Sequence, residues 1–69
     1  MKISARNTLK GKVKNLVNGP VSTEVVVEIA PGIEVVSVIT SHSAQDLGLK
    51  QGTSVTAIIK ASNVLLAVD

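Results

Sequence analysis

The stretch Val21 to Thr40 reads VSTEVVVEIAPGIEVVSVIT, and it decides the fold of the chain. As far as residue 30, apolar and polar side chains alternate with a period of two, which predicts a half-buried β-strand over residues 21–30. The side chains expected on its buried face are Val21, Thr23, Val25, Val27 and Ile29. Pro31-Gly32 is typical of a hairpin turn, and residues 33–40 are expected to return as a strand that is apolar on both faces. Such a strand usually has a second layer packed against it, and another subunit is one source of that layer.

Three more β-type runs lie outside this stretch, at residues 9–17, 54–60 and 64–68. The first run loses its alternating phase near Leu16, which predicts a bend or a bulge in that strand. Turn-forming residues separate the runs, so each run is expected to be a separate strand.

The only helical signal is the segment from Ser43 to Gly48. Ser43 is expected as the N-cap of this helix, and Gly48 is expected to end it in a left-handed conformation. The order is therefore three strands, a short helix and two strands. This order predicts an all-β fold, namely a five-stranded OB-fold-like barrel with one short helix between strands 3 and 4. We expect residues 1–69 to form a single domain.

The composition predicts self-association. A domain of 69 residues buries only roughly 60% of its unfolded surface, so a lone monomer is marginal, and small domains are usually stabilised by disulfides, a metal or association. There is no cysteine, and the lone histidine, His42, cannot form a metal site with the few carboxylates present. Association is what remains, so we expect a homo-oligomer without a bound metal.

The sequence argues against several classes of function. Enzyme motifs are absent, because the serine, histidine and aspartate residues that could form a triad all lie in one short segment. We therefore expect no catalytic residue and no catalytic cofactor. No apolar run reaches the roughly 20 residues of a membrane span, and the N-terminus does not resemble a secretory signal. These features predict a cytoplasmic protein that has no membrane partner.

Nucleic-acid binding stays open as an alternative. The net charge is +2, and five of the cations lie within the first fourteen residues. These cations fit an OB-type nucleic-acid-binding module, but they also fit a solvated strand edge. Aromatic residues make up 0% of the chain, and single-strand binders stack bases on aromatic rings. We therefore expect no nucleic-acid partner.

Two polar clusters and one helix start carry the candidate chemistry. Ser4-Ala5-Arg6-Asn7 and Lys60-Ala61-Ser62-Asn63 each place a cation two positions from a hydroxyl, and such side chains share one face of an extended chain. Thr40 to Ser43 adds hydroxyls where the third strand meets the helix. All these groups donate hydrogen bonds, which suits a fully deprotonated oxyanion better than one that keeps a proton.

Structural roles compete with this interpretation. Arg6 is a candidate for an ion pair with a carboxylate, Lys60 for an exposed strand edge, and Ser43 for a helix cap. In this interpretation the partner of Arg6 is Glu24, Glu28 or Asp69.

The same clusters carry a resemblance to a known family. Residues 4–13, SARNTLKGKV, resemble the start of the molbindin (Mop) family and of related TOBE/Mop-type domains in molybdate-responsive regulators and transporter ATPases. Residues 24–29 are similar to the second strand of that family, residues 39–52 to its helix region and residues 60–64 to the start of its last strand. The resemblance covers nearly the whole chain, in the same order and spacing.

The resemblance implies intracellular binding of molybdate or tungstate, for storage and homeostasis. It also implies a homohexamer, built as a trimer of dimers, with the anions held at subunit interfaces. The oxyanion ligands carried over by motif are Ser4, Ala5 (through its backbone), Arg6, Thr40, Ser43, Lys60, Ala61 (through its backbone) and Ser62. His42 and the Gly19-Pro20 turn match no pattern firmly, so a second type of site there stays open. A purely structural assembly domain is a third interpretation.

Overall fold

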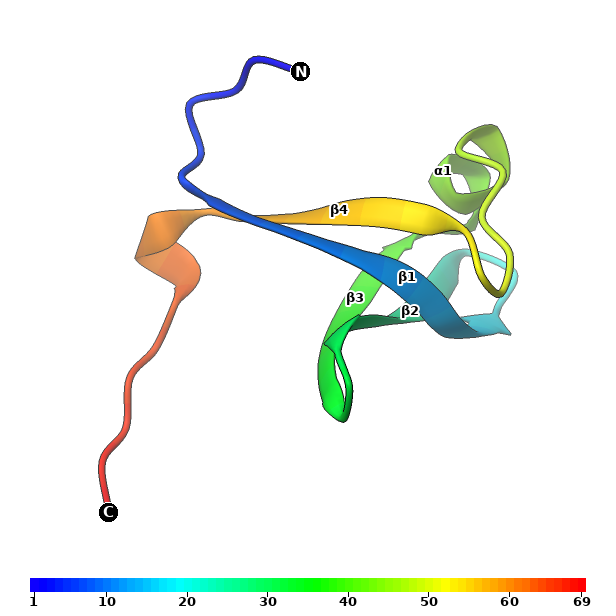
Figure 1. Ribbon diagram of the computed structural model, residues 1–69. Coiled ribbons are helices and arrows are strands. Elements are labelled where there is room, and N and C mark those ends of the chain that lie inside the picture. Colours follow the sequence, from blue (N-terminus) through cyan, green and yellow to red (C-terminus); the bar gives the residue numbers. More distant parts are fainter.

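The computed structural model describes residues 1–69. The fold is a strongly curled antiparallel sheet with one short helix at its side (Figure 1). The elements are β1 (Asn7–Asn18), β2 (Ser22–Ala30), β3 (Ile33–Thr40), α1 (Ser41–Asp46), β4 (Ser54–Ile59) and a 3₁₀ turn, η1 (Ala61–Asn63). The strands are ordered β3-β2-β1-β4, so β1 and β2 lie in the middle and β3 and β4 form the edges.

The alternation predicted the centre of the buried face of β2 correctly, but Val21 was wrong, because it precedes the strand and is 73% exposed, and Ile29 is only half-buried. Thr23, Val25 and Val27 are buried, and Val13 of β1 joins the two valines in the core. Pro31-Gly32 turns the chain into β3 as expected, and Gly32 has a φ of 77°, which few residues with a side chain adopt. The predicted irregularity in β1 is also present, because the register with β2 shifts between Val13 and Asn15.

The helix begins earlier than the sequence indicated. The Oγ1 atom of Thr40 accepts a hydrogen bond from the Ser43 amide at 3.0 Å, so Thr40 is the N-cap and the prediction of Ser43 was wrong. Thr40 is the last residue of β3, where it pairs with Ser22, so the helix follows the strand with no loop between them. Gly48 follows the helix with a φ of 64°, as predicted. Its amide donates to the Gln45 carbonyl, as in a Schellman helix end.

The predicted fifth strand is absent, and the barrel is not closed. Residues 64–68 are extended, but they pair with no strand and lead away from the sheet after η1 (Figure 1). Their apolar composition favours a strand, yet a strand needs a neighbouring edge, and the 3₁₀ turn directs this segment away from β4. The molecule is therefore a four-stranded, half-open barrel. Neither helix has the length and apolar character needed to cross a membrane.

The small core leaves much apolar surface uncovered. Only 5 of 69 residues are buried, whereas Val36 and Val38 on the outer face of β3 are exposed. In the C-terminal segment Leu65, Leu66 and Val68 are 90%, 93% and 97% exposed. Exposed apolar residues that are contiguous in this way mark interaction surfaces.

Candidate functional site

The pairing of β1 with β4 brings the two polar clusters together. Asn7 pairs with Ile59 at the end of this ladder. The ladder ends at this pair, so Arg6 and Lys60 are the first residues beyond it on the two strands, and Lys60 leads into η1. Ser4 and Ser62 lie near them, beyond the end of the sheet. Two segments that are far apart in sequence therefore meet at one end of the sheet.

These residues line a pocket, which we call the end pocket. Its cavity volume is about 670 Å³, and its lining consists of Ser4, Ala5, Arg6, Ile58, Lys60, Ala61 and Ser62. The lining holds two cations and two hydroxyls and contains no carboxylate. Six of the eight residues expected from the sequence thus lie together, and the cavity is much larger than one five-atom oxyanion requires.

The polar groups of the end pocket have no partners within the chain. Arg6 forms no ion pair, so the alternative in which it pairs with Glu24, Glu28 or Asp69 is wrong for this structure. Lys60 is likewise unpaired, and its carbonyl accepts the Asn63 amide at 2.9 Å where η1 begins. The first amides of such a turn have no partner inside it. The pocket is therefore a set of unused donors.

The other two expected ligands lie elsewhere. Thr40 and Ser43 lie where α1 begins, and Figure 1 shows α1 near the start of β4 and η1 beyond the other end of that strand. A strand of six residues spans about 17 Å, which is far beyond the reach of a side-chain hydrogen bond. The Thr40 hydroxyl donates to Ser43 Oγ at 2.8 Å, which leaves the Ser43 proton free. One chain alone does not bring all eight residues together.

A buried network that the sequence did not predict holds the start of α1. Ser41 Oγ donates to the Gly19 carbonyl at 2.6 Å and lies 2.8 Å from Oγ1 of the fully buried Thr23. A hydroxyl has one proton, so Thr23 is the donor in the second bond. The alternation along β2 predicted that Thr23 is buried, but only the fold shows that Ser41 is a hydrogen-bond partner of the Thr23 hydroxyl. This network ties the Gly19-Pro20 turn to the helix.

The remaining charged groups form local pairs. The side chain of His42 lies 3.2 Å from Asp46, one helical turn on, and both are largely exposed. Lys14 donates to Glu34 and lies 3.9 Å from Glu28, also on the surface. The hydrogen bond and the charge of Glu34 raise the pKa of Lys14 above its ordinary value of 10.5. Neither pair belongs to the end pocket.

The curled sheet and its donor-lined pocket define a class of small β-domain. The chain belongs to the TOBE domain family, which matches residues 3–66. Within that family it is a member of the molbindin (Mop) group. It is 53% identical over 66 residues to molybdenum-pterin-binding protein 3 of Clostridium pasteurianum, and the match covers 96% of this chain and 97% of that protein.

Solved structures support the same assignment. A molybdate-binding protein from Sporomusa ovata is 41% identical and superposes with a TM-score of 0.91, over 99% of this chain and 100% of that one. The cytoplasmic molybdate-binding protein ModG, in a form with molybdate bound, is 45% identical with a TM-score of 0.95. That match covers 100% of this chain and 49% of the ModG chain. The half-open sheet is thus the fold of relatives that bind molybdate.

Proposed function

We propose that this protein binds molybdate, and tungstate as its close analogue, for storage and homeostasis in the cytoplasm, without catalysis. The observation that carries this proposal is the end pocket, where two separate segments supply donors and no carboxylate. Molybdate is fully deprotonated near neutral pH, so it accepts hydrogen bonds and needs no acceptor. The relatives that are described as molybdate-binding support the choice of anion. In this proposal residues 1–69 act as one binding module.

The proposed ligands come from two chains. The end pocket supplies Ser4, the Ala5 and Ala61 backbones, Arg6, Lys60 and Ser62, whereas Thr40 and Ser43 of a second chain complete the site. This division follows from the distance between the two groups of residues and from the size of the open pocket. It agrees with a homo-oligomer whose anions lie at subunit interfaces, and a hexamer built as a trimer of dimers is the assembly we propose.

The absence of aromatic residues argues against ligands that contain a planar ring. A pterin ring or a nucleic-acid base would usually stack on an aromatic side chain, and aromatics make up 0% of this chain. Several relatives are named molybdenum-pterin-binding proteins, yet the end pocket offers donors for an oxyanion and no surface for a ring. We therefore propose the oxyanion itself as the ligand.

Titration calorimetry of the full chain tests the proposal. Molybdate and tungstate should bind, and sulfate and phosphate should bind more weakly. Arg6→Ala and Lys60→Ala should each weaken molybdate binding by about tenfold or more, because each removes a charge-assisted hydrogen bond. Lys2→Ala and Lys50→Ala remove the same charge outside the pocket and should leave the affinity unchanged. Absence of heat with molybdate, or equal affinity for sulfate, would overturn the proposal.

Mixed assemblies test whether two chains share a site. Arg6→Ala chains and Ser43→Ala chains should each bind molybdate poorly when assembled alone. If one site takes Arg6 from one chain and Ser43 from another, unfolding and reassembling an equal mixture should restore about a quarter of the sites. Recovery of no sites would show that the two residues do not act across chains.

A further inference from the structure

A second group of unused donors lies in the middle of the β1–β4 ladder. Lys10 pairs with Thr56 and Lys12 pairs with Ser54, and the four side chains lie on one face of the sheet. We call this group the β1–β4 cradle. Its four corners are two ammonium groups on one strand and two hydroxyls on the other. Between them lies the Gly11–Val55 pair, and the depression has a volume of about 440 Å³.

The charges of the cradle are not balanced within the chain. Neither Lys10 nor Lys12 takes part in an ion pair, whereas the next lysine on this strand, Lys14, contacts two glutamates. The side chains of Ser54 and Thr56 make no hydrogen bond to another side chain or to the backbone. All four groups are exposed and available to a ligand.

The spacing of the four groups suits one tetrahedral anion. Alternate residues of a strand are about 6.7 Å apart, and directly paired residues are about 5 Å apart across the ladder. Lysine side chains are long and flexible, so both ammonium groups can converge on an anion that lies above the Gly11–Val55 pair. The two hydroxyls then reach the same anion from the other strand.

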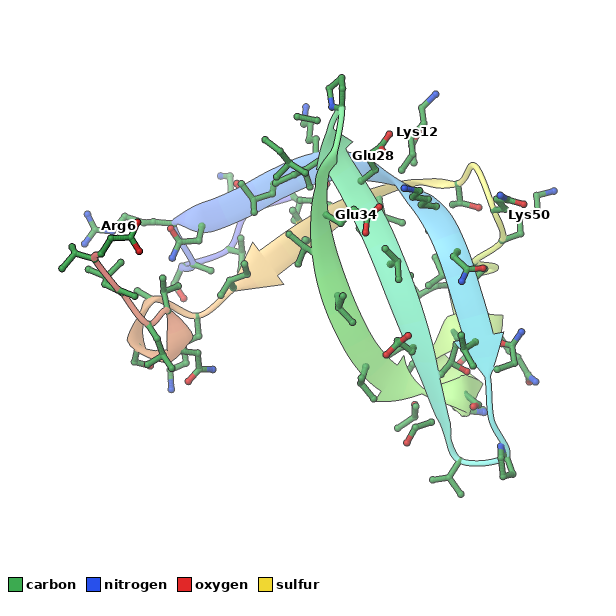
Figure 2. All side chains as sticks on the ribbon, turned by 90° about the horizontal axis from the view of Figure 1, so that it is seen from below. Arg6, Lys12, Glu28, Glu34 and Lys50 are labelled. Atoms are coloured by element: carbon green, nitrogen blue, oxygen red, sulfur yellow. The ribbon has the colours of Figure 1, made fainter.

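A carboxylate at the border of the cradle indicates which anion fits. Glu28 of β2 is paired with Lys12 in the sheet, and Figure 2 shows the two side chains near one another. Monohydrogen phosphate carries a proton near neutral pH and can donate it to a carboxylate or to a hydroxyl oxygen. A fully deprotonated anion gains nothing from Glu28 and is repelled by it.

We propose that the β1–β4 cradle is a second anion site that takes inorganic phosphate in its monohydrogen form. A phosphomonoester is largely deprotonated near neutral pH and has little proton to donate to Glu28, so it fits the cradle less well. The cradle shares no residue with the end pocket. The two sites therefore differ in ligand as well as in place, and the second does not depend on the first.

The experiment is a titration of the full chain followed by ¹H–¹⁵N correlation spectra. The probes are inorganic phosphate, glycerol 2-phosphate and sulfate, each at constant ionic strength. The amides of Gly11 and Val55 should shift with inorganic phosphate and shift less with glycerol 2-phosphate and with sulfate, which have little or no proton to donate. In the double variant Lys10→Gln/Lys12→Gln the affinity for phosphate should fall by about tenfold or more. The control variant Lys2→Gln/Lys50→Gln loses the same two charges and should keep the wild-type affinity.

Each other outcome has a defined meaning. Equal losses in the two double variants would show that phosphate responds only to net charge, which overturns the proposal. Unchanged affinity in Lys10→Gln/Lys12→Gln overturns it as well. Equal responses to inorganic phosphate and to glycerol 2-phosphate would show that the proton on the anion is not recognised, which overturns the choice of ligand. Molybdate binding by Lys10→Gln/Lys12→Gln should remain as in the wild type, since its pocket is intact.

Discussion

Placing a charge in the C-terminal segment, Leu66→Glu, should break the assembly of the protein. Leu66 is 93% exposed in the isolated chain and lies in an extended apolar segment that pairs with no strand. β3 and β4 are the two edges of a half-open sheet, so each presents unpaired backbone groups to a further strand. We predict that this segment adds a strand to the sheet of a second subunit, where its leucines and valines are covered.

The size of the effect follows from the area that becomes covered. Burying a leucine side chain contributes about 2 kcal/mol, which is roughly 30-fold in an equilibrium constant. Two copies of Leu66 in a symmetric dimer contribute about 4 kcal/mol, and replacing both with glutamate should weaken dimerisation by about a thousandfold. Burying an unpaired carboxylate adds a further penalty, so this figure is a lower bound.

Sedimentation velocity over a range of protein concentrations is the suitable assay. The wild-type chain should sediment as an oligomer, and Leu66→Glu should sediment as a smaller species. Gln51→Glu adds the same charge at an exposed turn and serves as the matched control, which should sediment as the wild type does. If Leu66→Glu keeps the wild-type sedimentation coefficient at micromolar concentration, the segment does not form the interface and the reasoning is refuted.

Three further predictions concern the stability of the chain, each read from equilibrium unfolding. Gly11→Ala should destabilise by about 1–3 kcal/mol, because the new Cβ would lie 2.5 Å from the Glu28 carbonyl oxygen; an unchanged urea midpoint would contradict this. Thr40→Ala should cost about 1 kcal/mol by removing the helix cap, whereas Thr40→Ser should retain most of it. Glu34 raises the pKa of Lys14 in the folded state above 10.5. The contact between Lys14 and Glu34 therefore stabilises the fold below pH 10.5, and this stabilisation is lost as the pH rises through the folded-state pKa of Lys14. The Glu34→Gln variant should not show this loss of stability at alkaline pH. If the free energy of unfolding depends on alkaline pH in the same way in both proteins, the contact does not contribute.

The parts of the fold that depend on local pattern were predicted from the sequence. The alternation along β2 gave the buried positions of Thr23, Val25 and Val27 because one face of that strand meets the core and the other meets solvent. Pro31-Gly32 gave the hairpin because proline presets one backbone angle and glycine accepts a positive one.

The errors arose where the outcome depends on a neighbour. Residues 64–68 have the composition of a strand, but whether they pair depends on reaching a sheet edge, and η1 directs them away from the open edge at β4 of their own chain. Thr40 and Ser43 are both suitable caps, and the choice fell to Thr40 because β3 runs as far as its pair with Ser22. Patterns within a short segment do not contain either piece of information.

Only part of the candidate site could be predicted, because the rest also depends on which segments become neighbours. The chemistry of Ser4, Arg6, Lys60 and Ser62 can be read from residue types, since all four are donors. Their proximity depends on the register of β1 with β4, which no local signal specifies. The separation of Thr40 and Ser43 from the end pocket follows only from the complete path of the chain.

The distance in sequence between the two halves of the end pocket has a consequence for folding. Arg6 and Lys60 are 54 positions apart, and closing a loop of that length costs about 3.5 kcal/mol of chain entropy. The pocket therefore does not exist in a chain whose first and last strands have not yet met, however well the β2–β3 hairpin is formed. An anion bound in the end pocket, as proposed, would hold together the contacts that close the longest loop. The ligand should accordingly slow unfolding. It should not change the rate at which the β2–β3 hairpin forms early in folding.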